Sequence, residues 1–193
     1  MNYLAHLHIA DYCHSSLLGN LLGDFVKGDP DTQFSTEIAR GIRLHRLVDA
    51  YTDSHPVMQQ AKAYFPSQTR RFAPIALDMF WDHCLANEWR QYHSLSLRSF
   101  VNQAQQRVQR AHPAVLPERF TRVSTHMWQG RWLESYADFD NIEFALQRMS
   151  QRSPRMAPLA HCFDSMQRHY QPLNALFATL YPDVLEKAKL AEV

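Results

Sequence analysis

The chain has 193 residues, of which 46% are hydrophobic and 20% charged, and its formal net charge is +1. This length and composition exclude a disordered chain and favour one folded domain, which we place over residues 1–193. The balanced charge excludes an overall basic protein, so we expect no nucleic-acid partner. No 18 uncharged apolar residues follow one another, so we also expect no membrane association.

The three cysteines, Cys13, Cys84 and Cys162, are widely spaced and form no C-x-x-C pair. They support neither a disulfide framework nor a thiolate zinc site. The first residues lack the basic and apolar regions of an export signal. We therefore expect a cytoplasmic protein, and the sequence gives no indication of its oligomeric state.

Apolar residues that recur three to four positions apart indicate an all-α protein, a single compact multi-helix domain. The low count of five glycines agrees with this fold class. Proline- and glycine-rich stretches after Gly28, at "HPV", at "FPSQTRRFAP" and at "RSPRMAP" are predicted to be connections. We predict helices over residues 2–12, 16–27, 36–53, 73–92, 96–111, 117–136, 140–151, 155–170 and 173–190.

Candidate functional residues begin in the first predicted helix. His6 and His8 in "YLAHLH" are two residues apart, so they diverge on a helix and we expect one of them to face solvent. Asp24 follows in "GNLLGDFVKG", where three glycines permit close backbone packing around a lone acid. Structural and functional roles are both open for Asp24.

The helix over residues 36–53 carries a line of potential metal ligands. His45, Asp49 and Asp53 are spaced four residues apart and fall within a sector of about 80°. A basic stripe recurs on another side of the same helix and consists of Arg40, Arg43 and Arg46. The alternative for this segment is an ordinary amphipathic helix with a solvated charged face.

The stretch "DMFWDHCL", residues 78–85, places acidic groups among bulky apolar residues. On a helix Asp78 and Asp82 share a face with Trp81. Buried carboxylates need hydrogen bonds, a cationic partner or a metal ion. His83 is a further candidate ligand, and the alternative is a buried imidazole paired with Asp82.

Taken together, these segments offer oxygen and nitrogen donors for one metal site: Asp24, His45, Asp49, Asp82 and His83. Such donors suit Mn²⁺ or Mg²⁺ better than a thiolate-bound zinc ion. A metal in an open site polarises a phosphoryl oxygen and supplies hydroxide, which predicts phosphoester hydrolysis. The chain contains no nucleotide-binding glycine loop, no serine-hydrolase elbow and no H-E-x-x-H motif.

Several blocks in one order resemble the acyl carrier protein phosphodiesterase family: "MNYLAHLHIA", "SSLLGNLLGDFVKG", "GIRLHRLVDAYTDSHP", "TRRFAPIALDMFWDHCL" and "RSPRM". The resemblance runs from end to end. It implies an all-helical, manganese-dependent relative of the HD-domain phosphohydrolases that removes 4'-phosphopantetheine from holo acyl carrier protein. HD-domain enzymes have adjacent His-Asp, whereas Asp82 precedes His83 in this chain.

The resemblance implies metal ligation by Asp24, His45, Asp82 and His83, with Asp49 as a further ligand. Asp24 would hold the metal or accept a proton from water, and His6 would support the ligands or transfer protons. Asp53, Asp78 and His55 are held in reserve as site residues.

Arginines are expected to bind the substrate. Arg70 and Arg71 would neutralise charge on the phosphoryl group, and the basic stripe would meet the acidic carrier protein. Two alternatives stay open. One is an HD-like phosphohydrolase of a nucleotide or another small phosphate ester, and the other is a non-enzymatic helical module that holds a cofactor such as haem.

Overall fold

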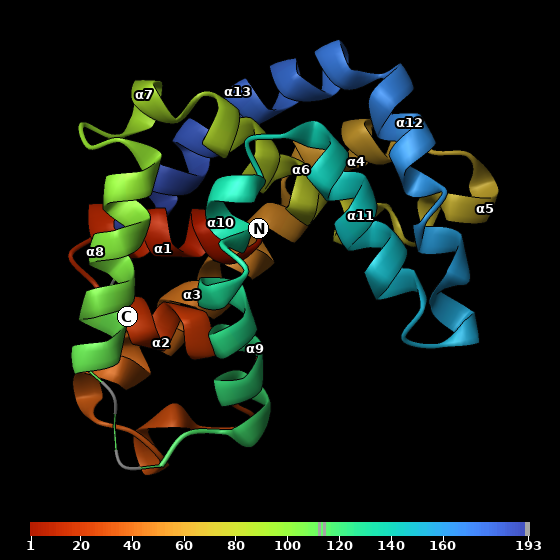
Figure 1. Cartoon of the computed structure of the whole chain (residues 1–193). Helices are drawn as coiled ribbons and strands as arrows, with labels where there is room; N and C mark the ends of the chain where they lie inside the picture. The colour runs from red at the N-terminus through yellow and green to blue at the C-terminus, as the bar shows by residue number, and fades with distance from the viewer. Residues whose placement is uncertain (112, 114, 192–193) are drawn as a thin grey trace.

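The computed structural model describes residues 1–111, 113 and 115–191. Every regular element of these residues is helical, which confirms the predicted all-α class (Figure 1). The elements in chain order are α1 (Tyr3–Tyr12), α2 (Leu17–Leu22), η1 (Pro30–Thr32), α3 (Thr36–Ser54), α4 (Pro56–Ala63), α5 (Ser67–Arg70), α6 (Ala73–Asn87), α7 (Trp89–Tyr92), α8 (Leu97–Arg110), α9 (Glu118–Gln129), α10 (Trp132–Ser135), α11 (Phe139–Ser150), η2 (Pro154–Leu159), α12 (Cys162–Arg168) and α13 (Tyr170–Lys189).

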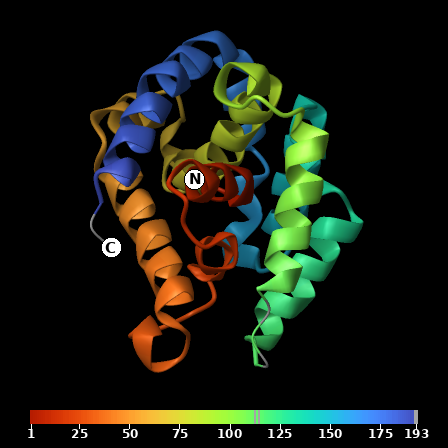
Figure 2. The same ribbon diagram turned by 90° about the vertical axis from the view of Figure 1, so that its left-hand side faces the viewer.

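The first helix lies at the centre of the molecule. Figure 2 shows α1 nearly end-on, with α3 on one side and α8 on the other. Residues 4–10 are all buried, because α1 is surrounded by other helices. The buried hydrophobic residues form one cluster that extends along the chain from Met1 to Ala188.

Several predicted boundaries differ from the structure. The helix predicted over 16–27 ends at Leu22, and those over 73–92, 117–136 and 155–170 are each divided in two. Helices α4 and α5 occupy a stretch predicted to be a connection. Pro56 is the first residue of α4, where its missing N–H group costs no intrahelical hydrogen bond.

Glycines allow α2 and α3 to approach closely. A Cβ atom on Gly19 would lie 2.3 Å from the carbonyl oxygen of Ile38 and 2.9 Å from Cα of Gly41. A Cβ atom on Gly23 would lie 2.2 Å from ring atoms of His45. The glycine-rich segment therefore packs directly against the part of α3 that carries candidate ligands.

Among the described residues, no helix combines the length and apolar character needed to span a membrane.

Candidate metal centre

Helices α1 and α3 bring two histidines to one carboxylate. Nε2 of His6 lies 3.1 Å from Oδ1 of Asp49, and Nε2 of His45 lies 3.0 Å from Oδ2 of the same residue. One ligand atom of each residue lies within 4.8 Å of the other two. His45 and Asp49 meet because residues four apart share a helix face, and packing of α1 against α3 adds His6. We call His6, His45 and Asp49 the histidine–aspartate cluster.

The two imidazole rings of this cluster are stacked. Their centroids are 3.7 Å apart and their planes differ by 19°, and both side chains are buried. Nδ1 of His6 and Nδ1 of His45 have no hydrogen-bond partner within the described parts of the chain, and Nε2 of His45 contacts the Asp49 and Asp24 carboxylates without a well-formed hydrogen bond. Buried nitrogens rarely stay unpaired, so stacked imidazoles with free nitrogens beside a carboxylate fit a bound metal ion.

Asp24 provides a second carboxylate at the open side of the cluster. Its Oδ1 lies 3.5 Å from Nε2 of His45, and its side chain is 56% exposed. The residue follows the end of α2, so it is placed by the close α2–α3 packing. The structure thus groups four predicted site residues, His6, Asp24, His45 and Asp49, where solvent can enter.

The charges of this group are strongly coupled. Burial, together with the nearby charge of His45, lowers the pKa of His6 to about 4. Burial also acts to lower the pKa of His45, but the adjacent Asp24 and Asp49 carboxylates outweigh it and raise this pKa to about 9. Burial acts to raise the pKa of Asp49, but bonds from both histidines outweigh it and hold it well below its usual range. Without a metal ion, His45 is therefore a cation between two carboxylates, and His6 is neutral.

Asp78 forms an ion pair with the N-terminal ammonium group. Its Oδ1 lies 2.7 Å from the α-ammonium group of Met1, which is also 3.7 Å from Asp49. Burial acts to lower the pKa of this ammonium group, but Asp78 and Asp49 outweigh it and raise the pKa to about 10. Burial raises the pKa of Asp78 to about 6. Asp78 therefore borders the cluster through an ion pair.

Asp82 differs from the ligand role predicted for it. Its carboxylate accepts hydrogen bonds from the backbone N–H groups of Asn2, Leu4 and Ala5 at 3.2, 2.7 and 3.1 Å. These donors lie at the N-cap (Asn2) and in the first turn of α1, where N–H groups lack partners in the helix. Burial raises the pKa of Asp82 to about 7 in spite of these bonds. Asp82 thus anchors the helix that carries His6.

His83 likewise lies apart from the histidine–aspartate cluster. Its Nδ1–H donates to the carbonyl oxygen of Tyr136, and its Nε2 accepts from the hydroxyl of Tyr170, both at 2.7 Å. Burial lowers its pKa, which favours the neutral ring. Asp82 and His83 are thus bonded to different parts of the fold, and neither is grouped with His45 in the histidine–aspartate cluster.

A family model described as acyl carrier protein phosphodiesterase matches residues 1–184. The chain belongs to this family. Proteins named acyl carrier protein phosphodiesterase are similar over nearly their whole length. The protein from Serratia proteamaculans is 45% identical over 190 residues, 98% of each chain. That from Yersinia enterocolitica is 44% identical over 190 residues, 98% of each, and that from Escherichia coli O6:K15:H31 is 40% identical over 189 residues, 97% of each. No solved structure matches the chain.

Most arginines predicted to bind substrate in this member of the acyl carrier protein phosphodiesterase family contact the protein itself. Arg43 forms an ion pair with Asp31. Arg46 donates to the carbonyl oxygens of Val26 at 2.7 Å and Gly28 at 2.9 Å. Both therefore tie α3 to the loop that follows Asp24. Arg40 is exposed near the start of the same helix.

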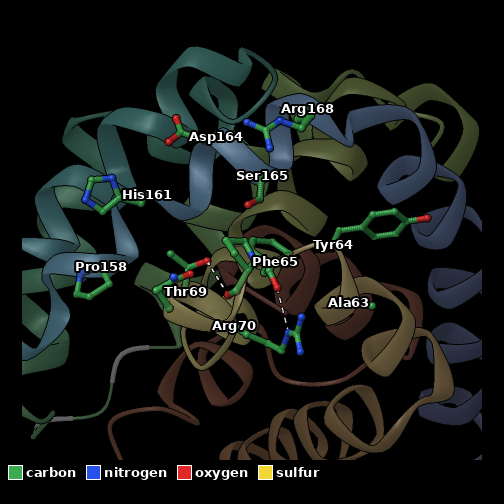
Figure 3. Close-up of a pocket in the computed structure, with 12 residues that line it drawn as sticks. Ala63, Tyr64, Phe65, Thr69, Arg70, Pro158, His161, Asp164, Ser165 and Arg168 are labelled. Atoms are coloured by element: carbon green, nitrogen blue, oxygen red, sulfur yellow. Dashed lines mark hydrogen bonds between the residues drawn. The ribbon is translucent and has the colours of Figure 1, made fainter.

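Arg70 and Arg71 lie in a different region from the cluster residues. Arg70 donates from Nε to the carbonyl oxygen of Phe65 at 3.0 Å, and Arg71 stacks on Phe72. Arg70 lines a groove of about 670 Å³ between α5 and α12, shared with His161 and Arg168 (Figure 3). No residue of the histidine–aspartate cluster lines this groove.

Two further predictions are corrected by burial and contacts. His8 does not face solvent, because its ring lies between Tyr181 and Tyr92 and bonds to both. His55 contacts Asp183 on α13, with 3.2 Å between Nε2 and Oδ2. Neither histidine is part of the cluster.

Proposed function

We propose that this chain hydrolyses the phosphodiester between 4'-phosphopantetheine and a serine of holo acyl carrier protein. The products are the apo carrier protein and free 4'-phosphopantetheine. The observation that carries the proposal is the pair of stacked histidines sharing Asp49, in a chain whose full-length relatives are named acyl carrier protein phosphodiesterase. We also propose that the reaction takes place in the cytoplasm.

A manganese or magnesium ion is the proposed cofactor. His6, His45 and Asp49 would hold it, with Asp24 as a further ligand from the open side. Imidazole and carboxylate donors suit Mn²⁺, and the unpaired ring nitrogens are a reason to place an ion there. When bound, the ion supplies Lewis-acid polarisation of the phosphate and a water molecule of lowered pKa.

The protein residues have separate tasks in this proposal. The contact with the His45 imidazolium holds the pKa of Asp24 below its usual range, although burial acts to raise it. Asp24 is therefore ionised near neutrality and, being exposed, can orient the attacking water and accept its proton. Asp82 fixes the start of α1 and so positions His6.

A relationship to the HD-domain phosphohydrolases remains part of the proposal. In this proposal the metal-binding pair is His45 with Asp49, four residues apart on α3, in place of the adjacent Asp82 and His83; the contact between His45 and Asp49 supports this choice. That the basic stripe forms a binding surface for the acidic carrier protein also stays a prediction.

Incubation with holo acyl carrier protein and Mn²⁺, followed by intact mass of the carrier, tests the function. We expect the carrier to lose the mass of phosphopantetheine, and chelator to stop the loss. A chain that leaves the carrier intact while hydrolysing nucleotides or bis-(p-nitrophenyl) phosphate would instead be a small-ester phosphohydrolase.

A further inference from the structure

The groove between α5 and α12 has an arginine on each of two opposite walls. Figure 3 shows Arg70 on one side and Arg168 on the other, with Phe65 and Ser165 between them. Both arginines are exposed, and Arg70 is oriented by the bond from its Nε to the carbonyl oxygen of Phe65. Neither belongs to an ion pair within the part of the chain that the structure describes, so both charges are available to a ligand.

The floor of the groove is uncharged. Phe65, Thr69 and Ser165 are buried beneath the two arginines. Asp164 also lines the groove and stands four residues before Arg168 on α12, a spacing that permits an ion pair on a helix. The two exposed side chains form no such pair among the described residues, so Asp164 leaves the Arg168 charge free.

The segments that form the walls carry an excess of positive charge. Residues 62–71 and 154–168 contain one acid, Asp164, and five basic residues: Lys62, Arg70, Arg71, Arg155 and Arg168. The chain as a whole is nearly balanced, with a net charge of +1. A local basic surface of this kind attracts a partner that presents carboxylates.

The exposed side of α6 leads from this groove to the histidine–aspartate cluster. Within residues 73–86, α6 leaves only Pro74, Ile75 and Asp78 partly exposed. The backbone from Arg71 into α6 has helical angles, so Arg71 and Asp78, seven residues apart, share one face. Seven residues correspond to about 10 Å along a helix. Asp78 borders the cluster, so a continuous surface connects the cluster with the end of α5.

One bound protein can cover both regions. A typical stable interface buries about 800 Å² on each partner, which corresponds to a patch about 30 Å across. A carrier protein that places its phosphodiester at the cluster therefore also reaches the end of α5 and the basic groove beside it.

We propose that the groove between α5 and α12 binds an acidic surface of holo acyl carrier protein, whose carboxylates meet Arg70 and Arg168. This inference rests on the proposed function. It gives Arg70 a role in holding the carrier protein and not the phosphoryl group. It also adds a second surface to the predicted basic stripe, in which Arg43 and Arg46 are already bonded within the chain.

The test compares Arg168→Glu and Asp164→Asn with Arg98→Glu as the matched control. Arg98 is also an exposed helical arginine, and its helix α8 lies on the opposite side of the molecule from α5 and α12 (Figure 1). Calorimetry gives the Kd of the Mn²⁺-loaded full chain for apo acyl carrier protein, which has no bond to hydrolyse. Kinetics give KM and kcat on holo acyl carrier protein, with bis-(p-nitrophenyl) phosphate as the reference substrate.

Arg168→Glu should raise both the Kd for the apo carrier and the KM for the holo carrier by about threefold to tenfold, because repulsion replaces attraction between exposed charges. The kcat on the holo carrier and the hydrolysis of the small diester should match the parent chain. Asp164→Asn should lower the Kd, because it removes an acid that repels carboxylates. Salt at about 0.5 M should reduce both differences, since it screens exposed charges.

Effects of Arg168→Glu no larger than those of Arg98→Glu would overturn the inference. A raised KM for the holo carrier with an unchanged Kd for the apo carrier would also overturn it, because the groove would then hold the 4'-phosphopantetheine arm. If the parent chain binds the apo carrier but does not hydrolyse the holo form, the proposed function fails and the Kd values still decide the docking surface. If the parent chain binds neither form, both proposals fail.

Discussion

His6 and His45 stack face to face with ring centroids 3.7 Å apart, although 39 positions separate them in the chain. Oδ1 of Asp49 lies 3.1 Å from Nε2 of His6, and its Oδ2 lies 3.0 Å from Nε2 of His45. Through these two contacts Asp49 joins α1 to α3, so we expect its substitution to have the largest effect on the proposed metal site.

Asp49→Ala should abolish turnover and lower Mn²⁺ affinity by at least about 100-fold. Substituting a residue that only hydrogen-bonds to a metal ligand already lowers metal affinity by about 10- to 100-fold, so loss of a ligand should cost at least as much. Asp53→Ala, one turn further on α3, removes an exposed carboxylate and is the matched control. Calorimetry with Mn²⁺ and circular dichroism measure affinity and helicity. Equal Mn²⁺ affinity in the two variants would exclude Asp49 as a ligand.

Metal binding should release about one proton at pH 7.5. The pKa of His45 is raised to about 9 in the metal-free protein, so a metal ion at this ring must displace its proton, whereas His6, with a pKa of about 4, is already neutral. Apparent affinity should therefore rise about tenfold per pH unit up to about pH 9. Titration in buffers of different ionisation enthalpy counts the protons, and His45→Gln should reduce the count to zero.

The raised pKa of His45 also predicts how the stability of the metal-free protein depends on pH. The folded-state pKa of His45 exceeds its unfolded value of 6.5. Its contribution to the free energy of unfolding is therefore complete below pH 6.5 and is lost as the pH rises through about 9. The difference in melting temperature between the parent chain and His45→Gln should shrink over this interval. A constant difference from pH 6 to 9.5 would mean that His45 is not protonated between the two carboxylates.

Gly23→Ala tests the packing that places His45. The backbone of Gly23 has helical angles, so alanine suits its conformation, but the added Cβ would lie 2.2 Å from the imidazole. We expect this clash to displace the His45 ring, and the displacement to weaken Mn²⁺ binding and reduce turnover. Gly28→Asn is the control, since no atom lies within 4 Å of the Cβ position and asparagine tolerates its φ of +74°. Normal metal affinity in Gly23→Ala would show that the ring can move without functional loss.

The local parts of this site were predictable from sequence, and the distant ones were not. The spacing of four between His45 and Asp49 places them together on any helix. His6 joins them only through the packing of α1 on α3, which no periodicity encodes. The expectation that Asp82 and His83 complete the site took two neighbours as a unit, whereas one caps α1 and the other bonds to Tyr136 and Tyr170.

The helix boundaries were likewise predicted only in part. The apolar spacing predicted α3 within one residue at its C-terminal end, because its buried stripe is regular. Pro56 and Pro66 were taken as breaks, although proline also begins or precedes helices, and so α4 and α5 were not predicted.

Asp82→Ala should destabilise the fold by about 3 kcal/mol, because three backbone N–H groups at the start of α1 lose a buried acceptor. Chemical denaturation measures this loss. At temperatures where the variant is still folded, we expect it to retain Mn²⁺ binding better than Asp49→Ala. An unchanged unfolding midpoint with lost Mn²⁺ affinity would return Asp82 to the ligand set.

Arg46 should affect catalysis through the loop that follows Asp24. Its guanidinium group bonds to the carbonyl oxygens of Val26 and Gly28, so Arg46→Met leaves two acceptors without this donor and loosens the segment that carries Asp24. We expect a loss of about 1–2 kcal/mol in stability and a lower kcat on both the carrier protein and a small diester.

Asp31→Asn is the control for Arg46→Met, because it weakens the neighbouring, more exposed ion pair to Arg43 and should cost less than about 1 kcal/mol. If the basic stripe instead mainly attracts the acidic carrier protein, Arg46→Met would raise KM for the carrier alone and leave kcat on the small diester unchanged. Measuring both substrates at low and high salt separates the two roles, since screening weakens attraction between exposed charges but not the hydrogen bonds that hold the loop.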